Sequence, residues 1–213
     1  MSGNRPQKTI LIGSGALARD IVGVFGRDAF VGTFVDEGFP ASPVEGLPVI
    51  TDWDVVRRCA SHYFLGILDS AHRIRARQYA TSLGLIPVAP MIHHSAQVAP
   101  DARLSPGCLV GYFSVIGPSS ELQEDVMVMH SAVVAHDTVI GENSVVLPGA
   151  WIGGFTRIGE GCFIGANSSL VPHITIGSNS FVAAGAVCFR DALPNSMLLG
   201  NPARRNEIVK KYE

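Results

Sequence analysis

Aliphatic residues recur at every sixth position over most of the C-terminal half of this chain of 213 residues. The series is Ile92, Val98, Leu104, Val110, Ile116, Leu122, Val128, Val134, Ile140, Val146, Ile152, Ile158, Ile164, Leu170, Ile176 and Val182. A period of six is neither that of an α-helix nor that of an alternating strand. It is typical of hexapeptide repeats and predicts a parallel β-helix, in which one aliphatic residue on each face points inward.

Three hexapeptides would complete one triangular coil of 18 residues. Residues 18 apart in the sequence would then lie directly above one another, one coil apart. The run from Ile92 to Val187 then makes about five coils, stacked at the strand spacing of about 4.8 Å. Small residues follow most of the aliphatic ones four places later, where a tight corner is expected. Cys108 and Cys162 are three coils apart, about 14 Å by that spacing, which is too far for a disulfide.

The sequence before the repeat predicts a different architecture. Strands are expected at residues 8–13, 29–36 and 62–68, and helices at residues 18–26, 52–60 and 71–84. Strands that alternate with helices in this way predict a parallel α/β sheet. The predicted fold class is therefore α/β plus β. A small Rossmann-like domain is expected at residues 1–88, and a β-helix domain at residues 89–213 that ends in a short helix over residues 207–213.

Composition and charge exclude several classes of protein. With 47% hydrophobic and 16% charged residues the chain is too apolar for a disordered protein. A formal net charge of −2 gives no reason to expect a nucleic-acid partner. The sequence has no run of about 18 apolar residues and no signal peptide, so we expect no membrane insertion and a cytoplasmic location. The four cysteines lack the spacing of a zinc site, and no metal is expected.

A glycine loop joins the first expected strand to the first expected helix. Gly13 allows the tight turn and Gly15 lets a phosphate approach the backbone, while the helix N-terminus favours an anion. Asp36 ends the next strand, where its carboxylate can accept hydrogen bonds from ribose hydroxyls. The N-terminal domain is long enough for only half of a dinucleotide fold, so we expect a mononucleotide rather than NAD. The alternative is a plain strand–helix turn that binds nothing.

His136 is the strongest candidate for acid–base chemistry among the seven histidines. It lies two places after an inward-facing residue, on an expected exposed part of the coil, and Asp137 beside it can orient the imidazole. Gly154 follows 18 residues later, in the same column one coil along. A glycine at that position leaves backbone beside the imidazole, where an amide N–H could receive a thioester oxyanion. The alternative is an exposed histidine with no catalytic task.

Two further histidine pairs share columns of the predicted coil. His94 and His130 are 36 residues apart, which places them two coils from each other, and His173 shares the column of Asp137 in the same way. Imidazoles at a subunit boundary could bind zinc, as in the β-helical carbonic anhydrases. No third ligand completes either pair in the sequence, so a zinc hydratase is a minor alternative.

Together these features resemble a known family, the NeuD/PglD/PerB-like sialic-acid O-acetyltransferases and nucleotide-sugar N-acetyltransferases of bacterial glycan synthesis. The most specific pieces are HSAVVAHDTVIG at residues 130–141, the repeat itself, and the segment from Gly200 to Arg204 that matches a G-x-P-A-[KR] ending. The resemblance covers nearly the whole chain. It implies a left-handed β-helix, an exception to the usual handedness of crossovers. It also implies a homotrimer with acetyl-CoA in the groove between two β-helices.

The resemblance also implies roles for individual residues. His136 matches the catalytic histidine, Asp137 its acidic neighbour, and Gly154 the glycine whose amide faces the thioester carbonyl. The substrate-binding residues on the nucleotide side would be Gly13, Ser14, Gly15, Ala16, Asp36, Asp69 and Arg73. Apart from the resemblance, we expect the phosphates of acetyl-CoA to be bound near the C-terminal end by the basic residues Arg190, Arg204, Arg205 or Lys210. Leu17 and Val145 stand where members of the family often carry histidine.

We therefore expect an acetyl-CoA-dependent N-acetyltransferase that acts on the amino group of a nucleotide-linked 4-amino-4,6-dideoxy sugar, with His136 as the general base. O-acetylation of a sialic-acid-type sugar is the first alternative, because a lone histidine base suits either nucleophile. The second is a β-helical binding or assembly subunit that catalyses nothing. The sequence names neither the base of the nucleotide nor the sugar.

Overall fold

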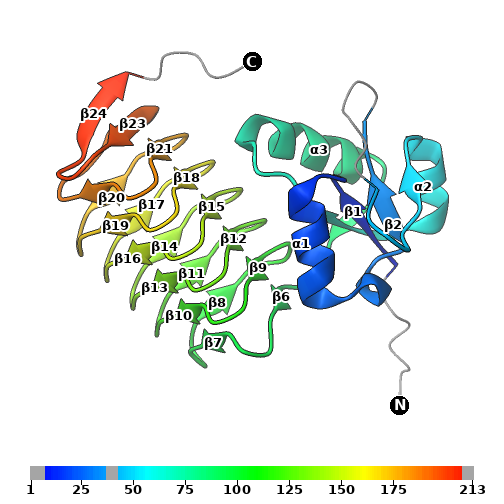
Figure 1. The fold of residues 1–213 in the computed structure, drawn as a ribbon, viewed down its shortest axis with the longest axis horizontal. Helices are drawn as coiled ribbons and strands as arrows, with labels where there is room; N and C mark the ends of the chain where they lie inside the picture. The colour runs from blue at the N-terminus through cyan, green and yellow to red at the C-terminus, as the bar shows by residue number, and fades with distance from the viewer. Residues whose placement is uncertain (1–7, 37–42, 208–213) are drawn as a thin grey trace. The chain divides into compact units, whose positions relative to one another are not determined.

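The computed structural model describes residues 8–36 and 43–207, in which the chain forms two compact units, Met1–Ala89 and Pro90–Glu213. Figure 1 shows a sheet with helices in the first unit and a stack of short strands in the second. Each unit has its own hydrophobic core. No helix among the described residues combines the length and apolar character needed to cross a membrane.

The N-terminal unit is a parallel sheet of five strands in the order β3-β2-β1-β4-β5. Its strands are β1 (Thr9–Ile12), β2 (Gly32–Phe34), β3 (Val49–Ile50), β4 (His62–Leu65) and β5 (Ile86–Pro87). Its helices are α1 (Ala16–Phe25), α2 (Trp53–Cys59), α3 (Ser70–Ser82) and the short 3₁₀ helix η1 (Arg27–Ala29). All four residues of β1 are buried, as expected of a central strand whose two faces are both covered. The expected Rossmann-like sheet is thus confirmed.

Two details of this unit differ from the sequence-based expectation. The strand expected at residues 29–36 begins only at Gly32, because Ala29 still belongs to η1. The two-residue strands β3 and β5, at the edges of the sheet, were not predicted, since they are too short to show an alternating pattern.

The C-terminal unit is a left-handed parallel β-helix, whose two-residue strands form three parallel sheets. The strands are β6 (Met91–Ile92), β7 (Gln97–Val98), β8 (Arg103–Leu104), β9 (Leu109–Val110), β10 (Val115–Ile116), β11 (Glu121–Leu122), β12 (Met127–Val128), β13 (Val133–Val134), β14 (Val139–Ile140), β15 (Val145–Val146), β16 (Trp151–Ile152), β17 (Arg157–Ile158), β18 (Phe163–Ile164), β19 (Ser169–Leu170), β20 (Thr175–Ile176), β21 (Phe181–Val182) and β22 (Val187–Cys188). The predicted aliphatic series supplies the second residue of every strand from β6 to β21. From Val110 onward each of these residues is at most 3% exposed.

Residues 18 apart lie above one another, as the register of Val134 with Ile152 shows. Small hydroxyl residues line the inside of the corners and donate to carbonyl oxygens one coil along. Ser120 Oγ donates to the carbonyl of Ala135 at 2.8 Å, and Thr138 Oγ1 donates to that of Gly153 at 3.2 Å. These hydrogen bonds satisfy polar groups that the coil buries, which explains the small residues at the corners.

The turns between strands share one unusual backbone conformation. Every sixth residue from Gly107 to Gly185 has a positive φ angle. Glycine, asparagine and aspartate tolerate this conformation best, whereas Phe113 and Phe155 adopt it at an energetic cost. Asp137 is one member of this series, at 56°.

An antiparallel hairpin follows the last coil, formed by β23 (Ser196–Leu199) and β24 (Arg204–Glu207). It extends the sheet of β21, with which β23 pairs in parallel. The hairpin was not predicted. Glu207, where a terminal helix was expected to begin, ends β24, and the rest of that expected helix lies outside the described residues.

Candidate active site

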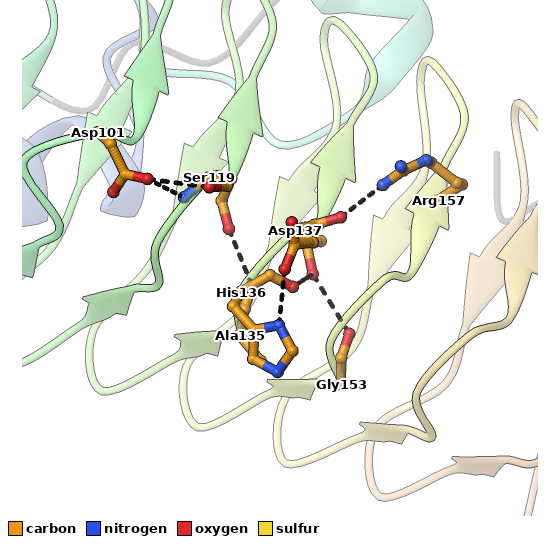
Figure 2. Close-up of polar contacts among 9 residues, drawn as sticks. Asp101, Ser119, Ala135, His136, Asp137, Gly153 and Arg157 are labelled. Atoms are coloured by element: carbon orange, nitrogen blue, oxygen red, sulfur yellow. Dashed lines mark hydrogen bonds and ion pairs between the residues drawn. The ribbon is translucent and has the colours of Figure 1, made fainter.

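His136 and Asp137 occupy the turn between β13 and β14, at one corner of the β-helix. Hydrogen bonds fix this turn to the coils on both sides. The N–H of Asp137 donates to the carbonyl of Pro118 at 2.9 Å, and its own carbonyl accepts from Arg157 Nη1 at 2.5 Å. The carbonyl of His136 accepts from the N–H of Phe155 at 3.1 Å. The repeat therefore holds the backbone of both residues in place, and Figure 2 shows the bond from Arg157 to the Asp137 carbonyl.

The two side chains are hydrogen-bonded to each other. His136 Nδ1 lies 2.8 Å from Asp137 Oδ2, and the side chains are 54% and 40% exposed. An ionised carboxylate can only accept, so Nδ1 carries the proton of the neutral imidazole and Nε2 keeps its lone pair. The arrangement gives an accessible base whose conjugate acid lies beside a negative charge.

Gly154 lies directly against the imidazole. A Cβ atom at this position would stand 2.7 Å from His136 Cε1 and 2.8 Å from Nε2, closer than such atoms approach. Gly154 is itself buried, its carbonyl accepts from the N–H of His173 at 2.9 Å, and its own N–H has no hydrogen-bond acceptor among the residues that the structure describes. The structure therefore brings His136, Asp137 and Gly154 together.

Two aromatic side chains complete this corner. The ring of Phe155 meets the imidazole of His136 edge-on, with centroids 5.2 Å apart, and stacks on His173 at 4.8 Å. Phe155 was not singled out from the sequence, although it lies 18 residues after Asp137, in the same column as His173. The Phe155 side chain is 43% exposed. Its positive φ angle is a strained backbone conformation for phenylalanine, and it lies directly beside the candidate base.

The N-terminal unit contains a cavity of about 740 Å³ at the carboxyl ends of β1, β2 and β4. Ligands bind at this edge of open α/β sheets. The cavity is lined by Ile12, Gly13, Ser14, Gly15, Phe34, Val35, Asp36, Trp53, Gly66, Ile67, His72, Arg75, Ala76 and Tyr79. Four of the predicted substrate-binding residues are thus among its lining: Gly13, Ser14, Gly15 and Asp36.

The other three predicted substrate-binding residues do not line the cavity. Ala16 is the first residue of α1. Asp69 caps α3, where its Oδ1 accepts from the N–H of His72 at 2.9 Å. Arg73 is fully buried and donates to the carbonyls of Leu65 and Ile67. Asp69 and Arg73 therefore shape the loop between β4 and α3, and the basic residues that do line the cavity include His72 and Arg75.

The cavity also has an aromatic wall that sequence reasoning missed. Trp53 packs against Phe34, with ring centroids 3.8 Å apart, and against Tyr79 at 4.8 Å. These three residues come from three different elements, β2, α2 and α3, so their spacing in the sequence gives no signal of a shared site.

The predicted acetyl-CoA contacts lie near the C-terminal end of the β-helix. Arg190 is exposed shortly after β22, and Arg204 and Arg205 are exposed on β24. Lys210 lies outside the described residues.

The described residues contain no group of three or more His, Cys, Asp or Glu side chains that could hold a metal ion. His94 packs on His93, with ring centroids 4.1 Å apart, whereas His130 stacks on Tyr112 at 3.7 Å.

Known proteins share both the repeat and the fold. The model of the bacterial transferase hexapeptide family matches residues 119–154 and 155–190. No curated protein sequence matches the chain. A histidine-substituted variant of perosamine N-acetyltransferase from Caulobacter crescentus, solved with CoA and GDP-perosamine, is 27% identical, with a TM-score of 0.86 over 95% of this chain and 98% of that chain.

Two further solved structures have the same architecture. The acetyltransferase domain of PglB from Neisseria gonorrhoeae, solved with acetyl coenzyme A, is 26% identical, with a TM-score of 0.85 over 95% of this chain and all of that chain. WeeI from Acinetobacter baumannii shows the same fold at 20% identity, with a TM-score of 0.81 over 94% of this chain and all of that chain. The resemblance in the sequence is therefore confirmed: the chain carries bacterial transferase hexapeptide repeats on the fold of the NeuD/PglD/PerB-like sugar acetyltransferases.

Proposed function

We propose that the chain transfers the acetyl group of acetyl-CoA to the amino group of a nucleotide-linked 4-amino-4,6-dideoxy sugar, for the synthesis of a bacterial surface glycan. The observation that carries the proposal is the contact of His136 with Asp137 on one side and Gly154 on the other. Acyl transfer needs an accessible base, a group that stabilises its protonated form and a donor for the oxyanion, and the His136 imidazole, the Asp137 carboxylate and the Gly154 N–H can supply these three.

The reaction follows from these three residues. The sugar amine attacks the thioester carbonyl carbon, forming the new C–N bond, while His136 Nε2 takes the proton that the amine releases. Asp137 stabilises the resulting imidazolium, and the N–H of Gly154 donates to the oxyanion of the tetrahedral intermediate. The C–S bond then breaks, the amide forms, and the departing CoA sulfur takes the proton back from His136.

The solved relatives support the choice of both substrates. The Caulobacter enzyme is a perosamine N-acetyltransferase with CoA and GDP-perosamine bound, and the Neisseria domain binds acetyl coenzyme A. In this chain the cavity of the N-terminal unit has the glycine loop and the carboxylate that suit a nucleotide. We therefore propose that this cavity holds the nucleotide of the sugar substrate.

We also propose that three copies of the chain assemble into a homotrimer. The outward residues of the sheet that contains β13 include Val115, Val133 and Trp151, and Trp151 is 41% exposed. The sheet that contains β14 instead presents Arg103 and Arg157. An apolar face of this kind on one side of a coil favours contact with another copy.

Release of free thiol from acetyl-CoA tests the chemistry, with a panel of UDP-, GDP- and dTDP-linked 4-amino sugars as acceptors. One acceptor should give stoichiometric CoA and an N-acetylated product. His136→Ala should lower kcat by roughly 10²–10⁴ with the fold retained, whereas His62→Gln, in the N-terminal sheet, should not. An ester product would instead support O-acetylation, and turnover by His136→Ala near that of the wild type would exclude His136 as the base.

A further inference from the structure

The lining of the cavity in the N-terminal unit contains two chemically different groups of residues. The lining includes the glycine loop, from Gly13 to Gly15, and the basic residues His72 and Arg75. Backbone N–H groups at a helix start, together with basic side chains, suit phosphates. The lining also contains Trp53, Tyr79 and Asp36, which adjoin a second hollow. A nucleoside diphosphate has two matching groups, with its negative charge at one end and an aromatic base at the other.

A second hollow of about 330 Å³ adjoins the larger cavity and shares Asp36, Trp53 and Tyr79 with it. Its other lining residues are Thr51, Asp52, Asp54 and Leu83. Tyr79 is 50% exposed, and its ring lies 4.8 Å from that of Trp53. An aromatic wall of this kind stacks on any base, so it binds a nucleotide without selecting one.

Selection depends on the hydrogen-bonding groups around that wall. Among the residues that the structure describes, the lining of the second hollow has three carboxylates and no basic side chain. One oxygen of Asp52 already accepts from the N–H of Asp54 at 2.8 Å, as the cap of α2. Ionised carboxylates only accept hydrogen bonds, so the edge of the base that meets them must donate.

Guanine is the base that meets this requirement. Its N1–H and exocyclic N2–H₂ are adjacent donors in one plane, which match the two oxygens of a carboxylate. Uracil and thymine offer a single N–H between two carbonyl oxygens, and those oxygens would face the carboxylates. Adenine presents one amino group beside an acceptor nitrogen. We propose that Asp52 and Asp54 select guanine, so that the sugar substrate is linked to GDP; this inference rests on the proposed function.

Intrinsic fluorescence tests the inference without any acetyl transfer. The chain has two tryptophans, so in the full-length Trp151→Phe protein the remaining reporter is Trp53, inside the cavity. Titration with GDP, UDP, dTDP and ADP should quench this fluorescence with a Kd for GDP at least about tenfold lower than for the others. The double variant Asp52→Asn and Asp54→Asn should lose that preference, because asparagine still caps α2 but also presents an amide donor. Asp20→Asn, an exposed change on α1, is the matched control and should keep it.

The outcomes separate this inference from the proposed function. Equal or tighter binding of UDP, dTDP or ADP would overturn the choice of guanine, as would a preference for GDP that survives in the double variant. If thiol were released with a UDP- or dTDP-linked amino sugar but not with a GDP-linked one, the choice of guanine would also be wrong. The proposed acetyltransferase function would still hold in that case. If no nucleotide quenches Trp53, the inference fails whatever the thiol assay shows.

Discussion

At the scale of single residues, the candidate site depends on one steric relation. The imidazole of His136 occupies the space that a side chain at position 154 would fill. Gly154 is also the candidate oxyanion donor. Its missing side chain leaves room for the imidazole, and its N–H would donate to the oxyanion in the same site. Phe155 supports this arrangement from the adjacent position, edge-on to the imidazole, although its backbone conformation is costly.

Gly154→Ala should therefore reduce turnover without removing the base. The new methyl group would push the imidazole aside, and the expected fall in kcat is about tenfold or more, as for a misplaced catalytic group. The KM for the nucleotide sugar should not change, because its proposed cavity lies in the N-terminal unit. Gly23→Ala is the matched control, since a Cβ there meets no atom within 4 Å. Full activity of Gly154→Ala would contradict the proposed role.

The cysteines inside the β-helix offer a second test at this scale. Burial raises the pKa of the thiols of Cys162 and Cys188 to about 11. A raised pKa keeps these thiols protonated at neutral pH, and protonated thiols react poorly. A thiol reagent at pH 8 should therefore modify at most Cys59 in the native protein and all four cysteines after denaturation. Rapid native modification of Cys162 would contradict the packing of the coil.

At the scale of elements, the N-terminal cavity depends on the close approach of two loops. Gly13 has a φ angle of 121°, and a Cβ atom on it would lie 2.4 Å from the carbonyl oxygen of Gly66. The turns after β1 and β4 thus meet through glycine, which leaves room for a ligand at the strand ends. Gly15 lacks such a neighbour within 4 Å, and its missing side chain leaves open space in the lining of the cavity.

Asp36→Ala should weaken binding of the nucleotide sugar alone. Loss of a hydrogen bond to a charged group costs about 1–3 kcal/mol, which corresponds to a rise in KM of about 5- to 150-fold. The KM for acetyl-CoA should stay constant, because Asp36 belongs to the other unit. Steady-state kinetics with each substrate varied in turn would measure both values. If the free amino sugar served as well as its nucleotide form, the cavity would not be a nucleotide site.

The elements also show what a sequence can and cannot predict here. The coil was predictable because its six-residue period is visible within a short stretch of sequence and fixes the place of each residue in the coil. Residues 18 apart lie in the same column, which places Gly154 beside His136. The cavity was predictable only along the glycine loop and as far as Asp36, where one strand–helix unit determines the geometry. Trp53 and Tyr79 reach the cavity from separate helices. Arg73 looked like a ligand contact, but its buried guanidinium binds loop carbonyls, which no local pattern distinguishes.

At the scale of the whole molecule, the β-helix has faces of different character. The second residue of each two-residue strand from β6 to β21 is aliphatic, so the first residue lies on the other face of its sheet, and successive strands belong to different sheets. Val133 and Val139 are such residues on neighbouring strands, both partly exposed. Val133 lies in register with Val115 and Trp151, whereas Val139 lies between Glu121 and Arg157. His136 is in the turn between the two.

This pair of valines gives a matched test of the proposed trimer. Val133→Glu would bury a charge if the apolar face contacts another copy, at a cost that a trimer of modest stability would not tolerate. Val139→Glu adds the same charge six residues away, on a face that already carries charged residues. Light scattering should give three chain masses for the wild type and for Val139→Glu, and a smaller species for Val133→Glu. The smaller species should also lose acetyl transfer, because a groove between two β-helices requires the partner; an active monomer would exclude an intersubunit site.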